Sequence, residues 1–108
     1  MNLEVRITNR DHGNPPGKLA DAELHFSGGA LDGFKLVGFA VWEGRRGNGR
    51  SVTFPARQYS VAGARRSFAL LRPIGDTGVR TRVRHLVLDA YDEQRRQAVQ
   101  PREVVNSK

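Results

Sequence analysis

Cysteine is absent from this chain of 108 residues. That absence excludes a disulfide framework, a thiol nucleophile and a metal site built from thiolates, so the chain needs no oxidising compartment. Long apolar runs are also missing. The first ten residues are too polar for a signal peptide, and no stretch approaches the roughly 20 apolar residues of a membrane-spanning helix. The sequence therefore predicts a cytoplasmic protein that does not enter a membrane.

Acidic residues are scarce in the middle of the chain. The segment 45–84 holds ten arginines, no lysine and one acid, Asp76, so it carries a net charge of +9, whereas the whole chain carries +7. A basic protein with its charge concentrated in this way is expected to bind a polyanion, and nucleic acid is the first candidate. Arginine has a planar fork that suits phosphates and base edges. A GC-rich genome would also favour arginine over lysine, but it would not explain the clustering.

Signals of catalysis are poor. The histidines, His12, His25 and His85, have no spacing that would place two metal ligands on one turn of a helix. Asp21 and Glu23 are typical of the solvated side of a strand, and no serine lies in a nucleophile elbow. We therefore expect a non-enzymatic protein with no catalytic residue, no metal site, no cofactor and no small-molecule substrate.

Hydrophobic periodicity predicts an α+β fold in one domain, residues 1–100, with residues 101–108 as a flexible tail. Alternating apolar residues predict a small antiparallel sheet of about five strands, joined as a meander with hairpins, over residues 3–7, 20–26, 34–42, 51–56 and 67–71. Residues 57–66 are interpreted as a basic connection.

One C-terminal amphipathic helix is expected after residue 78, where the apolar period changes to about 3.6. Its apolar stripe includes Leu86 and leaves out Leu88. Asp76 or Thr77 is the expected cap, and the helix is expected to end before Pro101.

The strand expected at 34–42 has apolar residues on both faces. One helix can cover only one face of its sheet, so the other face would need a second copy of the chain. The sequence therefore predicts a homodimer.

The segment 44–51, GRRGNGRS, resembles the spacing of a phosphate-binding P-loop. A P-loop lies between a strand and a helix, however, and here a β-patterned segment follows. We interpret the segment as a basic finger at the tip of a hairpin, in which Arg45, Arg46 and Arg50 reach phosphates or a groove. The alternative is a solvated loop.

A second basic group surrounds two aromatic residues, Tyr59 and Phe68. Arginine with interleaved aromatics is typical of surfaces that bind single-stranded nucleic acid. Phe68 fits the apolar side of the last strand and is assigned to the core, which leaves Tyr59 as the residue able to stack on a base. The basic residues of this group are Arg57, Arg65, Arg66 and Arg72.

Between about residues 19 and 91 the order of motifs resembles the stage V sporulation protein G (SpoVG) family. The resemblance rests on GFKLV at 33–37, VTFPAR at 52–57, RPI at 72–74 and LDAY at 88–91. It implies a small antiparallel sheet with a C-terminal helix, assembled as a dimer, that binds DNA or RNA as a regulator. Arg72 stands where that family tends to have histidine, and the tip at 44–51 is more basic, so the target and the mode of binding stay open.

Taken together, these features predict a non-enzymatic, SpoVG-like regulator that binds nucleic acid through the finger and the adjoining basic segment. Two alternatives stay open. The arginine-rich face could instead bind an acidic protein, either as an interaction module or as an accessory subunit of a larger enzyme.

Overall fold

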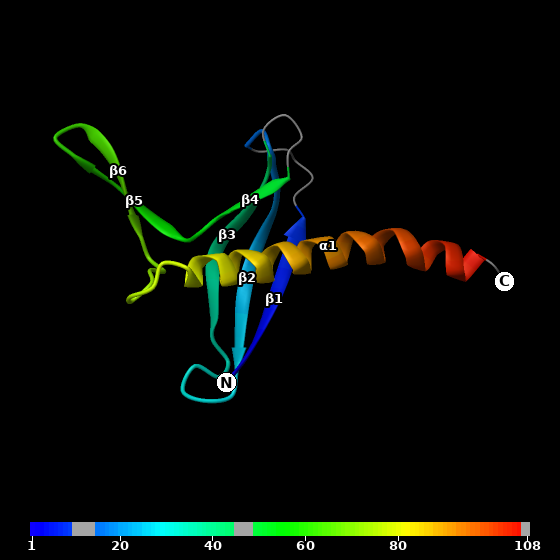
Figure 1. Ribbon diagram of the computed structural model, residues 1–108. Coiled ribbons are helices and arrows are strands. Elements are labelled where there is room, and N and C mark those ends of the chain that lie inside the picture. The colour runs from blue at the N-terminus through cyan, green and yellow to red at the C-terminus, as the bar shows by residue number, and fades with distance from the viewer. Residues whose placement is uncertain (10–14, 45–48, 107–108) are drawn as a thin grey trace.

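A computed structural model describes residues 1–9, 15–44 and 49–106, with side chains described for residues 1–8, 15–44 and 49–97. Six antiparallel strands precede one helix (Figure 1). The elements are β1 (Asn2–Asn9), β2 (Lys18–Ser27), β3 (Lys35–Glu43), β4 (Arg50–Thr53), β5 (Ala56–Val61), β6 (Ala64–Ala69) and α1 (Val79–Asn106). The first four strands form one sheet in the order β1-β2-β3-β4, and β5 and β6 form a separate ribbon. The predicted α+β fold is confirmed.

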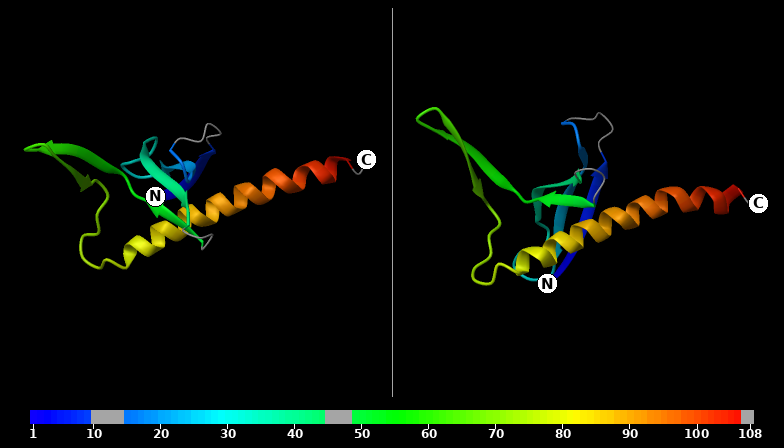
Figure 2. Two further views of the ribbon diagram at one scale, coloured as in Figure 1. Left: turned by 90° about the horizontal axis from the view of Figure 1, so that it is seen from above. Right: turned by 45° about the horizontal axis from the view of Figure 1, so that its top comes forward.

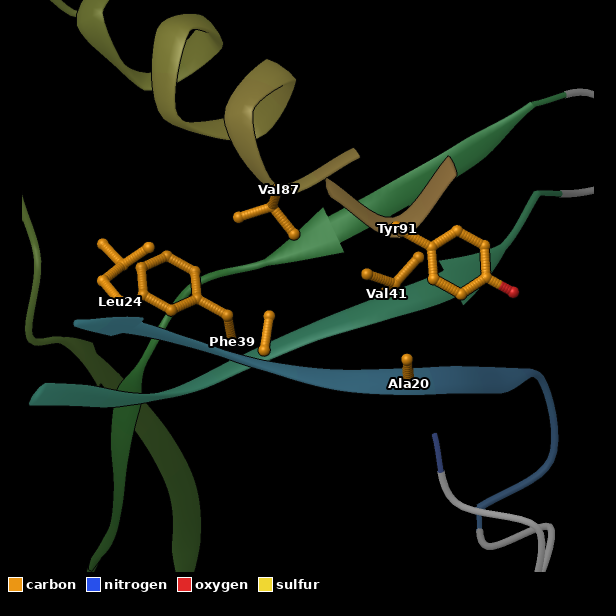
Figure 3. Close-up of a cluster of buried hydrophobic side chains, with 7 residues drawn as sticks. Ala20, Leu24, Phe39, Val41, Val87 and Tyr91 are labelled. Carbon is orange, nitrogen blue, oxygen red and sulfur yellow. The ribbon is translucent and has the colours of Figure 1, made fainter. Parts of the chain in front are cut away.

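The core lies between one face of the four-stranded sheet and α1, which crosses the strands (Figure 1). Strand β2 alternates buried and half-buried residues, as its sequence pattern predicts. Alanine at two of its buried positions leaves room for larger side chains above, and Figure 3 shows Tyr91 and Val41 over Ala20. The buried side chains of this cluster are Ala20, Ala22, Leu24, Phe39, Val41, Val87 and Tyr91.

The contact stripe of α1 differs from the predicted one by a small rotation. Val87 and Tyr91 are buried as expected, but Leu88 packs against the core while Leu86 is 40% exposed. The side chain of Asp76 accepts a hydrogen bond of 2.9 Å from the backbone N–H of Gly78, which supports its predicted role at the start of the helix. The expected end before Pro101 is wrong, because α1 continues to Asn106. No helix in the described ranges is both long and apolar enough to span a bilayer.

Gly38 makes a β-bulge that the period-two reading of β3 did not anticipate. Ala22 pairs with Phe39 and Glu23 pairs with Val37, so Gly38 is the extra residue, with a φ of +112°. The extra residue shifts by one position the alternation of side chains between the two faces of β3. It brings Leu36 to the same face as Phe39, where it packs against the core.

The opposite face of the sheet is therefore not the apolar surface that the sequence predicted. Strand β3 contributes only three apolar side chains to that face, and neighbouring strands surround them with charged and polar residues. Ion pairs join several of those charges, as between Arg6 and Glu4 and between Lys35 and Glu23. The three apolar residues are Val37, Ala40 and Trp42.

Residues 56–69, strands β5 and β6 with their turn, form a hairpin that we call the arm. The arm stands away from the sheet (Figures 1 and 2), and every residue in its two strands is exposed. The interpretation of residues 57–66 as a connection is wrong, since they make up most of this hairpin. The turn is Ala62-Gly63, with φ values of +51° and +82°, the signs required by a two-residue type I′ turn.

The base of the arm is fixed to the sheet. Pro55 is buried next to Gly38, and its carbonyl oxygen accepts a hydrogen bond of 3.0 Å from the N–H of Leu70. Pro55 lies just past β4, where a residue without a backbone donor leaves no ladder hydrogen bond unmade. With the arm on one side and the long helix on the other, the radius of gyration is 16.6 Å. A compact domain of this length has a value of about 13 Å.

Candidate functional site

The two faces of the arm differ in chemistry. Cross-strand partners share a face, and successive residues of a strand alternate between faces. Arg57 pairs with Phe68 and Tyr59 pairs with Arg66, so arginine and aromatic residues alternate along each strand and across the ribbon. The aromatic face consists of Arg57, Tyr59, Val61, Ala64, Arg66 and Phe68, and the polar face consists of Ala56, Gln58, Ser60, Arg65, Ser67 and Ala69.

Both rings of the aromatic face are open to solvent. Tyr59 is 42% exposed and Phe68 is 48% exposed. Together with Arg57 they line an open hollow of about 300 Å³. The assignment of Phe68 to the core is therefore wrong.

Arg72, three residues beyond β6, belongs to the same site. Its guanidinium carbon lies 4.8 Å from the centroid of the Phe68 ring, within the distance of a cation–π contact. The contact holds a positive charge beside an aromatic ring. The structure thus brings together four of the predicted residues, Arg57, Tyr59, Arg66 and Arg72, and places Arg65 on the other side of the same ribbon.

The charges of this site are not neutralised by the chain. Residues 56–75 contain four arginines and no acid. Within the described ranges, no carboxylate lies within ion-pair distance of these four side chains. These four residues are also exposed, so the N–H donors of their guanidinium groups stay available for an anion.

Of the three predicted finger arginines, the structure describes only Arg50. Arg45 and Arg46 lie outside the described residues. Arg50 is described, and its Nη1 lies 3.1 Å from the Oδ1 of Asp92 on α1, while its guanidinium also lies over the ring of Tyr91. Arg50 thus joins β4 to the helix, away from the arm.

A second hollow, of about 370 Å³, lies beside this pair between the sheet and α1. Arg50 and Arg95 line it, but so does Glu43, and Arg50 is already paired with Asp92. Its charge is therefore largely balanced within the chain. The arm and the adjoining Arg72, with their unpaired arginines, are the stronger anion site.

The sequence contains a signal for the arm that apolar alternation alone does not show. On either side of Ala62-Gly63, every second position carries an arginine or an apolar residue. These positions are Arg57, Tyr59 and Val61 before the turn and Ala64, Arg66 and Phe68 after it. If arginine is allowed on the same face as the apolar residues, the pattern is that of a hairpin with a two-residue turn. Apolar alternation alone could not find it, because two of the six positions on this face carry a charge.

Comparison of the chain with models of known protein families, with curated proteins and with solved structures found no match.

Proposed function

We propose that this protein is a non-enzymatic regulator that binds nucleic acid through the arm and the segment that follows it, with Arg57, Tyr59, Arg65, Arg66 and Arg72 as binding residues. The observation that carries the proposal is the group of four arginines on and beside a protruding ribbon, without an acid between residues 56 and 75. Unpaired positive charge on a projecting element attracts a polyanion. Arg45 and Arg46 stay predicted contributors.

The dimensions of the arm fit a nucleic-acid backbone. Each strand has six residues and so spans about 20 Å. Successive phosphates of one strand of a duplex are separated by about 3.4 Å along the helix axis, so an arm of this length can reach several of them. Guanidinium groups bind phosphate with paired donors, and phosphate contacts supply nearly all of non-specific nucleic-acid affinity and a large share of specific affinity.

The proposal is tested by measuring the affinity for labelled DNA and RNA strands and duplexes over a series of salt concentrations. Loss of one phosphate contact in Arg57→Ala is expected to reduce the log-log salt slope by about 0.7 on a single strand or about 0.9 on a duplex. Arg6→Ala is the matched control, because Arg6 is paired with Glu4 on the sheet. Equal slopes for Arg57→Ala and the parent would contradict the proposal.

An acidic protein partner is the alternative for the same surface. It predicts no measurable affinity of the parent chain for any nucleic acid. The arm variants would then lose only protein binding. The resemblance to the SpoVG family stays a prediction, and the proposal does not depend on it.

We also propose that the protein assembles as a homodimer. Large apolar side chains outside the arm stay exposed in a single chain, among them Phe34 at 65% and Val37 at 51%. Val37 lies on the open face of the sheet, where a second copy of the chain would cover it. Sedimentation at micromolar concentration is expected to give twice the chain mass of 12.0 kDa, and a monomer would contradict the proposal.

A further inference from the structure

The aromatic face of the arm has a feature that phosphate binding alone does not explain. Tyr59, Val61 and Phe68 are each between 42% and 50% exposed, on a ribbon of two strands that is separate from the sheet. An isolated two-stranded hairpin is only marginally stable, and aromatic side chains contribute most to stability when they are covered. Arginines that only meet phosphates would not need rings between them.

The two rings are placed as neighbours. Tyr59 is directly opposite Arg66, and Phe68 is two residues further along the same strand, on the same face. Such diagonal neighbours have Cα atoms about 7 to 8 Å apart. The hollow of about 300 Å³ lies at Tyr59 and Phe68 and extends to Arg57. The site therefore offers two adjacent ring surfaces and a guanidinium group at their side.

Each ring also has its own positive partner. Arg57 stands opposite Phe68, Arg66 stands opposite Tyr59, and Arg72 lies against Phe68 from the segment that follows. A buried apolar interface would leave these guanidinium groups without water or a counter-charge, at a high desolvation cost. A ligand that satisfies both kinds of group needs a flat π-surface and an anion in every repeating unit. An unpaired nucleotide has both.

We propose that the arm binds single-stranded nucleic acid, with unpaired bases stacked on Tyr59 and Phe68 and their phosphates bound by Arg57, Arg66 and Arg72. The inference rests on the proposed function and names the form of its ligand. In a duplex the faces of the bases are already stacked, and only their edges are open in the grooves. The aromatic face gains its stacking contacts only from a strand whose bases are free.

The first test changes the ligand and leaves the protein intact. The probes are a labelled DNA strand of about 12 nucleotides, the same sequence as RNA, its duplex, and a strand of equal length with abasic central positions. The abasic strand keeps its phosphates and loses its base faces. We expect the single strands to bind more tightly than the duplex, and the abasic strand to bind at least about fivefold more weakly than the intact DNA strand.

The second test changes the rings. In the double variant Tyr59→Leu, Phe68→Leu the arm keeps apolar side chains and all its arginines, while its stacking surface for two bases is lost. We expect the variant to lose at least about fivefold in affinity for the intact strand, and its affinity for the abasic strand to stay unchanged. Its salt slope is expected to match that of the parent, since the phosphate contacts are kept. Circular dichroism checks that the fold is retained.

The two neighbouring arginines of β6 provide a matched pair. Arg66 lies on the aromatic face and Arg65 on the polar face, and both are exposed. Arg66→Ala is expected to weaken single-strand binding more than Arg65→Ala. The reverse order, together with tighter duplex binding, would show that the polar face of the ribbon reads a groove and would overturn the stacking proposal.

Failure of the inference and failure of the proposed function give different results. If the parent binds intact and abasic strands equally, the arm binds phosphates without stacking, and only the inference is overturned. If the parent binds no strand or duplex at all, the proposed function is overturned and the inference falls with it. If the leucine variant changes the sedimenting mass instead of the affinity, the rings are a contact between two copies, which also overturns the inference.

Discussion

The same residue types lie in opposite environments in two regions of the molecule, the sheet with its helix and the arm. In the sheet and helix, Phe39 is buried, and three arginines are ion-paired: Arg6 with Glu4, Arg50 with Asp92 and Arg96 with Glu93. In the arm, phenylalanine is half exposed at Phe68, and Arg57 has no acid near it in the described ranges. Pairing and burial stabilise the first region. Their absence in the second leaves its groups free for a ligand. Exposed aromatic rings together with unpaired arginines are therefore a better guide to function here than charge alone.

The largest effect expected from this contrast is on stability. Phe39→Ala opens a cavity in the core and is expected to lower the free energy of unfolding by about 3 to 5 kcal/mol. Phe68→Ala removes a half-exposed ring from a ribbon outside the core and is expected to cost less than about 1 kcal/mol. Urea denaturation followed by the fluorescence of Trp42 measures both. Similar losses in the two variants would mean that the arm is part of the core.

The contact between the arm base and the sheet is tested at Gly38. A Cβ there would lie 3.1 Å from the Cβ of Pro55, and the φ of +112° already disfavours any side chain. Gly38→Ala is expected to cost about 1 to 3 kcal/mol more than Gly33→Ala, because crowding adds to the backbone strain. Gly33 also has a positive φ, of +88°, but nothing lies within 4 Å of its added Cβ, so it measures the backbone effect alone. Equal losses of unfolding free energy in urea denaturation would show that Pro55 moves aside at no cost.

The stability of the arm itself is tested at its turn. Ala62 has a φ of +51°, which an alanine adopts at a cost of about 1 kcal/mol. An asparagine in its place would tolerate this conformation and, with Gly63, form the pair preferred in type I′ turns. Ala62→Asn is therefore expected to slow hydrogen exchange of the arm amides severalfold while amides of β2 stay unchanged. Slower exchange throughout the chain would indicate that the arm and the sheet unfold together.

The smallest expected effect concerns a charged cluster on the open face of the sheet. A hydrogen bond of 2.8 Å between the His25 ring and Glu23 lowers the pKa of Glu23 below its ordinary value of 4.5, and Lys35 lowers it further. A carboxylate with a lowered pKa stabilises the fold above the pKa of the unfolded chain, and that contribution is lost as the pH falls through the folded value.

Glu23→Gln is therefore expected to be slightly less stable than the parent at neutral pH, and the difference is expected to vanish in acid, below the ordinary value of 4.5. Thermal melting over a pH series measures the difference. A gap that does not change with pH would show that packing of the side chain, rather than its charge, is responsible.

The sequence by itself determined the elements whose apolar residues repeat without interruption. Strands β1 and β2, the approximate start of α1 and the α+β class follow from such repeats, because burial of one face dictates the period. It also determined the charge: the arginine-rich segment 45–84 is visible in the composition alone.

Only the tertiary structure decided which of those residues act together. The bulge at Gly38 moved Leu36 to the core face, because one extra residue reverses the alternation of a strand. Apolar periodicity did not predict the arm, because Arg57 and Arg66 lie on the face that also holds its aromatic residues. No local pattern shows that a hairpin lies outside the sheet. Arg50 and Arg57 both belong to the arginine-rich segment, yet Arg50 forms an ion pair with Asp92 and Arg57 is exposed to solvent. Long-range contacts, which spacing along the chain does not encode, separate the structural arginine from the one left free to bind.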